Sequence, residues 1–129
     1  MYQMMLNRKN SRKGFTLVEV IVVLVILAIL AAIMIPAMTG WIDEANKKKV
    51  VVEARTVMLA CQTAASEIYG ETGATASDAD MKARANTILG SDGSTANATV
   101  TLTGNLITKF VYTKDTHTAT YAGNKWTVE

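Results

Sequence analysis

The chain has 129 residues, of which 50% are hydrophobic and 19% charged, and its formal net charge is +2. This length fits one globular domain with an appendage and excludes two full domains. The positive charge is concentrated at the start: residues 1–14 hold four basic residues and no acidic one, whereas nine basic and eleven acidic residues follow. The net charge therefore does not indicate nucleic-acid binding. The basic residues at the start instead flank the apolar segment that follows them.

Residues 15–40 form the most apolar segment of the chain, and residues 20–35 contain no polar side chain. This length matches the roughly 20 residues that an α-helix needs to cross a bilayer. Lipid tolerates such a helix because it satisfies its own backbone hydrogen bonds. The cations before the segment outweigh the mixed charges after it, so the positive-inside rule predicts a cytoplasmic N-terminus and an outward-facing remainder.

An ordinary secretory signal peptide is the simplest alternative, since it also has a basic start and an apolar core. It does not account for the length of this core, or for the lack of a small-x-small cleavage site after it. It also does not predict Glu19, a carboxylate at the start of the apolar run. Such a group is costly near hydrocarbon unless it is interfacial, protonated or paired. Taken alone, Glu19 could simply face water at the headgroup level.

The residues around Glu19 decide between these readings. The run RKGFTLVE at residues 12–19 leads directly into the aliphatic segment. It resembles the processing site of type IV pilins and their relatives, and the resemblance covers about the first third of the chain. It implies that prepilin peptidase removes residues 1–14 by cutting between Gly14 and Phe15, and that the new amine of Phe15 is N-methylated. It also implies that Glu19 sets subunit registration by facing the Phe15 amine of a neighbouring subunit.

Pro36 and Gly40 lie near the end of the apolar segment. A proline inside a helix removes one backbone hydrogen bond and bends or breaks the helix. Related pilins carry a proline at a comparable depth, so the resemblance implies a helix kink at Pro36 that Gly40 loosens further. The alternative is that the two residues only mark where the membrane helix ends.

The remaining residues, 41–129, predict an α+β head outside the membrane. Apolar residues at alternating steps of four and three form one helical stripe that runs to about residue 69, where Gly70 is expected to end the helix. Ser77 and Asp80 resemble a capping box, which predicts a short helix over about 77–89. The stripe consists of Val50, Ala54, Val57, Cys61, Ala64 and Ile68.

From about residue 98 to residue 129 the apolar period changes to two, and the alternate positions are largely threonine. This pattern predicts an antiparallel sheet with one apolar face, joined by turns at residues 104–105, 114–117 and 123–124. Packing that face on the helical stripe gives a two-layer head. The whole is an α+β fold in which the C-terminal half of a long hydrophobic helix covers a small antiparallel sheet, as in the pilin fold. Many pilins close a C-terminal loop with a disulfide, and this chain has no cysteine after Cys61.

No catalytic, cofactor or metal site is indicated, so we expect no enzyme. His117 is the single histidine and falls in a predicted turn, where a solvated position is expected. Cys61 is expected to be a small core residue. The lysines at residues 47–49 fit a solvated junction after a membrane helix, and nucleic-acid binding is not indicated.

The sequence therefore predicts the major structural subunit of a type IV pilus. The chain would enter the cytoplasmic membrane as a single-pass prepilin, be cleaved and methylated, and polymerise into an extracellular filament. Its expected partners are other copies of itself, prepilin peptidase, the assembly ATPase with its inner-membrane platform, and lipid before assembly. Two alternatives stay open: a pseudopilin of a type II secretion or DNA-uptake system, and an uncleaved, membrane-anchored binding module.

Overall fold

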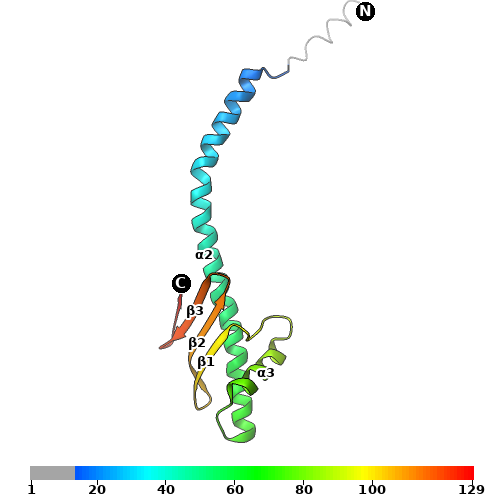
Figure 1. The fold of residues 1–129 in the computed structure, drawn as a ribbon, viewed down its shortest axis with the longest axis vertical. Helices are drawn as coiled ribbons and strands as arrows, with labels where there is room; N and C mark the ends of the chain where they lie inside the picture. Colours follow the sequence, from blue (N-terminus) through cyan, green and yellow to red (C-terminus); the bar gives the residue numbers. More distant parts are fainter. Residues whose placement is uncertain (1–13) are drawn as a thin grey trace, which may run out of the picture. The chain divides into compact units, whose positions relative to one another are not determined.

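The computed structural model describes residues 14–129, which form two helices and one four-stranded sheet (Figure 1). Contacts within the chain divide it into two units at the step from Trp41 to Ile42. We call residues 15–41 the apolar segment and residues 42–129 the head. The elements are α2 (Leu17–Thr72), α3 (Asp78–Leu89), β1 (Ala98–Thr103), β2 (Leu106–Lys114), β3 (His117–Ala122) and β4 (Lys125–Val128).

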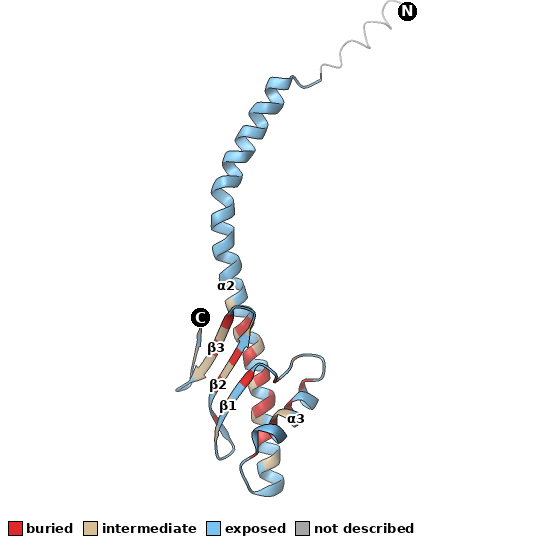
Figure 2. Ribbon diagram, in the orientation of Figure 1, coloured by how far each residue is buried: buried red, intermediate tan, exposed pale blue. Residues whose placement is uncertain are grey.

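The apolar segment is helical from Leu17 onward, as its composition predicts. It is long and apolar enough to cross a membrane, and 0% of its most apolar window is buried inside the chain. Figure 2 shows this part of α2 as exposed along its whole length. Residues 14–129 thus do not supply the packing partners that a helix of this composition needs.

The head has a core between α2, α3 and one face of the sheet. The predicted helical stripe is buried from Val50 to Ala64, and the sheet covers it with Phe110 and Ala119. Cys61 has 0% of its surface exposed, and desolvation by this burial raises the pKa of its thiol to about 11. Because little thiolate forms at neutral pH, Cys61 is an inert core residue.

The sheet is antiparallel, with its strands in the sequence order β1-β2-β3-β4. Apolar and threonine-rich faces alternate as predicted, with one register shift between Thr101 and Leu102. The last strand is held by pairing of Tyr121 with Trp126, whose ring also lies edge-on to Phe110 at 6.2 Å. These observations confirm the α+β fold with a long apolar helix and a small antiparallel sheet.

The end of α2 differs from the prediction. The helix continues through Gly70 to Thr72, and the residue that terminates it is Gly73, with φ 69°. The Gly73 amide donates to the Tyr69 carbonyl at 2.8 Å, which is the single hydrogen bond of an αL cap. The prediction of Gly70 is wrong because the cap needs a residue in a left-handed conformation, and Gly70, although it is the first glycine after the stripe, stays helical.

The short helix α3 begins as predicted at Ser77, whose hydroxyl accepts a hydrogen bond from the Asp80 amide at 3.2 Å. It is attached to the end of α2 by Arg84, whose two terminal nitrogens donate to the two oxygens of Glu71 at 2.9 and 3.0 Å. This bidentate geometry orients the α3 face that buries Met81, Ala85 and Leu89.

Three polar contacts attach the sheet to α2. Gln62 binds backbone atoms of the β1–β2 turn: its amide nitrogen donates to the Asn105 carbonyl at 2.6 Å, and its amide oxygen accepts from the Ile107 amide at 2.9 Å. At the other end of β2, Lys114 donates to Glu53 at 2.6 Å. This hydrogen bond raises the pKa of Lys114.

The third contact corrects the expectation for His117. It is not a solvated turn residue: it opens β3, is buried, and places Nε2 3.2 Å from Asp43 Oδ1. The turn itself is only Asp115 and Thr116, with Asp115 at φ 54°. Because the sharp turn takes two residues, His117 already points to the helix side of the sheet.

Candidate functional site

The residues predicted for processing lie just before α2. Gly14 and Phe15 are exposed, and Phe15 has 89% of its surface accessible. The basic residues Arg8, Lys9, Arg12 and Lys13 lie outside the described residues. A side chain at Gly14 would meet no atom within 4 Å, and its φ is not in the left-handed region. The fold of the chain therefore does not require glycine here, and a requirement for it would come from a molecule that handles this peptide bond.

Glu19 forms a capping box with Thr16 at the start of α2. The Glu19 amide donates to Thr16 Oγ1 at 3.2 Å, and the Thr16 amide donates back to Glu19 Oε2 at 3.3 Å. Both satisfy amide groups that have no partner inside the helix. The carboxylate also lies in the first turn, where the helix dipole favours negative charge. The spacing Thr-x-x-Glu is a readable signal for this cap, and the sequence reasoning missed it.

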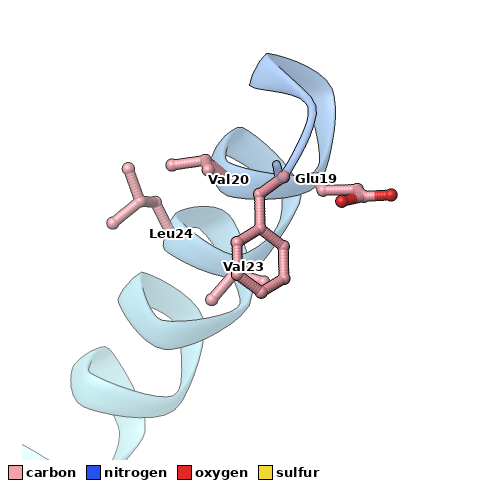
Figure 3. A pocket seen from close by; sticks show the side chains of 5 residues that line it. Glu19, Val20, Val23 and Leu24 are labelled. Atoms are coloured by element: carbon pink, nitrogen blue, oxygen red, sulfur yellow. The ribbon is translucent and has the colours of Figure 1, made fainter. Parts of the chain in front are cut away.

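A shallow groove runs beside this cap. It is lined by Phe15, Glu19, Val20, Val23 and Leu24, so that one charged group stands among apolar side chains. In Figure 3 the Glu19 carboxylate points away from Val20 and Leu24. Among residues 14–129 no cation lies within ion-pairing distance of Glu19. Within these residues its Oε2 accepts from the Thr16 amide, and Oε1 accepts no hydrogen bond.

Pro36 and Gly40 both lie inside α2, which is helical through each of them. Pro36 has no amide hydrogen to donate to the preceding turn. Its own carbonyl accepts a hydrogen bond from the Thr39 hydroxyl at 2.8 Å. A side chain at Gly40 would meet nothing within 4 Å. The kink stays a prediction for the assembled or membrane-bound protein.

The arrangement of the His, Cys, Asp and Glu side chains in residues 14–129 determines whether they could hold a metal ion. Within residues 14–129 no three His, Cys, Asp or Glu side chains lie close enough together to share a metal ion. His117 is engaged with Asp43, and Cys61 is buried.

Comparisons with known proteins found similarity over part of the chain. The prokaryotic N-terminal methylation motif matches residues 9–35. Over 44 residues the chain is 48% identical to the Type II secretion system core protein G of Klebsiella michiganensis, an alignment that covers 34% of this chain and 31% of that protein. The chain therefore matches about a third of the length of this curated relative. No solved structure matches the chain.

Proposed function

The methylation motif and the similarity to core protein G support the type IV pilin and pseudopilin family for this chain, and from that premise we propose that it is the repeating structural subunit of a type IV pilus. The motif implies processing by a prepilin peptidase and assembly in a pilus or secretion machinery. The apolar helix fits a protein anchored in the membrane before assembly.

The observation that carries the proposal is an apolar helix with no cover in its own chain. Every large apolar side chain that the structure describes in the apolar segment is exposed, from Phe15 to Trp41. Lipid covers such a surface in the membrane, and other copies of the same helix can cover it in a filament. Packing of these helices would supply most of the assembly energy, with an assembly ATPase and an inner-membrane platform driving extraction from lipid.

Glu19 would then set the axial step between subunits. Cleavage after Gly14 creates a positive amine on Phe15, four residues before Glu19. The capping box keeps the carboxylate oriented through Oε2 and leaves Oε1 for the Phe15 amine of a neighbour. An unpaired charge buried in an apolar filament is costly, so only subunit positions that pair the two groups are stable.

A second candidate is a pseudopilin of a type II secretion system. The similarity to core protein G favours it, over an alignment that covers 34% of the chain. Both candidates share processing and polymerisation, and they differ in where the filament is found. Sheared surface fibres that contain the chain support the pilus. Loss of protein secretion on deletion of the gene, without such fibres, supports the pseudopilin.

The registration role can be tested by two substitutions at Glu19. Glu19→Gln keeps a residue that can cap the helix but removes the charge, whereas Glu19→Ala removes both. We expect both variants to insert in the membrane and to lose filaments in the sheared fraction, with Glu44→Ala as the matched control. Filament loss in Glu19→Ala alone would show that Glu19 acts only as a helix cap. Normal filaments in both variants would overturn its role in subunit registration.

Processing can be tested at Gly14. Because a side chain there meets no atom of the fold, Gly14→Leu should leave the head folded while blocking cleavage. Intact mass should show the wild-type chain starting at N-methylated Phe15 and the variant still carrying residues 1–14. A variant with the mature mass would overturn cleavage at this bond.

A further inference from the structure

The sheet of the head ends at β4, which has a strand neighbour on one side. The strand order is β1-β2-β3-β4, and β4 pairs with β3 in one continuous antiparallel register. In Figure 1 this red strand lies at the margin of the sheet. Within residues 14–129 no strand pairs with its second side. That side is an open edge, to which another strand can form hydrogen bonds.

The hydrogen bonds at the end of the sheet show which backbone groups face the open edge. The Glu129 amide donates to the Thr118 carbonyl at 3.0 Å, and the Thr118 amide donates to the Glu129 carbonyl at 2.9 Å. Backbone groups alternate in direction along an antiparallel strand, so those of Thr127, two residues before Glu129, also face β3. The N–H and C=O groups of Trp126 and Val128 therefore point to the open edge.

The side chains along this edge alternate between the two faces of the sheet. Lys125, Thr127 and Glu129 are exposed on the threonine-rich face. Trp126 and Val128 lie on the core face and are half-buried. On its outer face the edge therefore carries a cation at its start, an anion four residues later, and a small polar side chain midway between the two charges.

These features make the edge complementary to itself. Two copies of β4 can run antiparallel with Thr127 of one copy opposite Thr127 of the other. In that register Trp126 lies opposite Val128 of the second copy, so that the free N–H and C=O groups meet in hydrogen-bonded pairs. Lys125 lies opposite Glu129 of the second copy at both ends, and opposite charges directly across two strands stabilise their pairing. Any other register separates these charges.

The opposite edge of the sheet, β1, lacks this complementarity. The exposed side chains of β1 are uncharged threonines, Thr99, Thr101 and Thr103. The register of β1 with β2 also shifts between Thr101 and Leu102, and such an irregularity increases the local twist and disturbs an edge. A lysine on an edge strand by itself opposes pairing with another strand. On β4 the lysine has an acidic counterpart on the same strand, so pairing of two copies neutralises both charges.

We propose that the β4 edges of two copies pair with each other and join the two sheets into one. The partner of the edge is thus a second copy of this chain. The contact uses the same residues on both copies, so it has a two-fold axis, which is perpendicular to the sheet. Because the head part of α2 packs on a face of the sheet, this axis reverses the direction of α2 in the second head.

This reversal decides which copies can meet. Subunits of one filament repeat head to tail and point the same way along its axis, so they do not form the contact with each other. In assembled protein the edge therefore joins heads of two filaments that run in opposite directions. That consequence rests on the proposed pilus, whereas the pairing of two heads does not.

Thr127→Cys in the full, detergent-solubilised chain tests the centre of the contact. Opposite residues of a non-hydrogen-bonded antiparallel pair have Cα atoms about 4.5 Å apart, a distance that a disulfide can span. The natural Cys61 is buried, so it does not compete. On mild oxidation we expect a disulfide-linked dimer from Thr127→Cys and at least ~10-fold less from Thr101→Cys, the control on the same face. Equal dimer fractions, or none from Thr127→Cys, overturn the inference.

Charge reversal tests the register. Adding Lys125→Glu to Thr127→Cys turns both opposite-charge pairs into like-charge pairs and should lower the dimer fraction at least ~10-fold. Adding Glu129→Lys as well restores opposite charges across the two strands, so the dimer should return. An undiminished dimer in the first variant, or no recovery in the second, would show that these charges do not select the pairing and would overturn the inference.

The disulfide assay needs no filament, so its outcome separates the two proposals. Sheared filaments of the wild-type chain without a Thr127→Cys dimer refute the pairing alone. A Thr127→Cys dimer from a chain whose wild type forms no filament refutes the proposed pilus and supports the pairing.

Discussion

The apolar segment and the head are parts of one chain that obtain their packing partners from different places. The head buries the stripe Val50 to Ala64 against its own sheet. Within the described residues, no buried side-chain nitrogen or oxygen lacks a hydrogen-bond partner. The apolar segment buries nothing in the chain and has one charge, at Glu19. Helix α2 runs through both, so the same backbone structure is stabilised inside the protein in one region and by the surroundings in the other.

This difference means that substitutions in the two regions should be detected by different measurements. Substitutions in the core, in the helix caps and in the polar contacts that hold the head together should change the unfolding of the head. Substitutions of residues whose partners lie outside the chain should change assembly. The following variants break or sharpen that separation.

The largest effect is expected from Phe110→Ala. Phe110 is fully buried beneath Trp126, and its loss leaves a cavity that should lower the free energy of unfolding by about 3–5 kcal/mol. Urea unfolding of the detergent-solubilised chain, followed by tryptophan fluorescence, measures the change. Leu24→Ala in the apolar segment is the control and should leave the midpoint unchanged. A shared loss of stability would show that the two regions unfold together.

Gln62→Ala should have an intermediate effect. It leaves the Ile107 amide and the Asn105 carbonyl without their side-chain partner, at a cost of about 1–3 kcal/mol in the same unfolding assay. Gln62→Glu can still accept a hydrogen bond from the Ile107 amide but cannot donate one to the Asn105 carbonyl. Its decrease in unfolding free energy should therefore differ from that of Gln62→Ala. A wild-type midpoint for Gln62→Ala would show that water replaces both contacts.

The two helix caps permit a direct comparison. Ser77→Ala removes the cap of α3 and should lower the unfolding free energy of the head by about 1 kcal/mol. Thr16→Ala removes the corresponding cap of α2 and should leave head unfolding unchanged, because only the first turn of the apolar segment frays. An equal effect of both substitutions would contradict the separation of the two regions.

The smallest effect concerns acid. The hydrogen bond from Arg84 lowers the pKa of Glu71 below its usual 4.5. A carboxyl with a lowered folded pKa contributes stability that is present above the unfolded pKa and is lost as pH falls through the folded value. Head stability should therefore decrease below about pH 4.5, and part of this decrease should be absent in Glu71→Gln. Urea titrations at several pH values would measure both decreases. An unchanged acid profile in Glu71→Gln would exclude this pair as a contributor.

The elements that the sequence predicted well are those encoded by local periodicity. The stripe from Val50 to Ala64 and the alternation along β1 each repeat a simple spacing, and the structure buries the expected residues. The capping role of Ser77 was predicted for the same reason, since its partner Asp80 lies three residues away.

The misplaced features depend on contacts that are distant in sequence. His117 lies 74 residues from its partner Asp43 along the chain, so the turn pattern alone suggested a solvated position. Thr56 and Thr63 are polar by type, and only the structure shows that their hydroxyls are bonded to carbonyls of their own helix. For the candidate site, the motif at residues 12–19 located Gly14, Phe15 and Glu19, and their roles stay predictions.

The contact between Gln62 and the β1–β2 hairpin has a consequence for which residues the tip of this hairpin can carry. In this hairpin Gln62 contacts two backbone groups, the carbonyl of Asn105 and the amide of Ile107, and its hydrogen bonds there do not involve the side chains at the tip. Asn105 and the exposed Leu106 could therefore be exchanged for other residues while the hairpin stays attached to the helix. Such a tip can change its outward chemistry without a change in the scaffold that carries it.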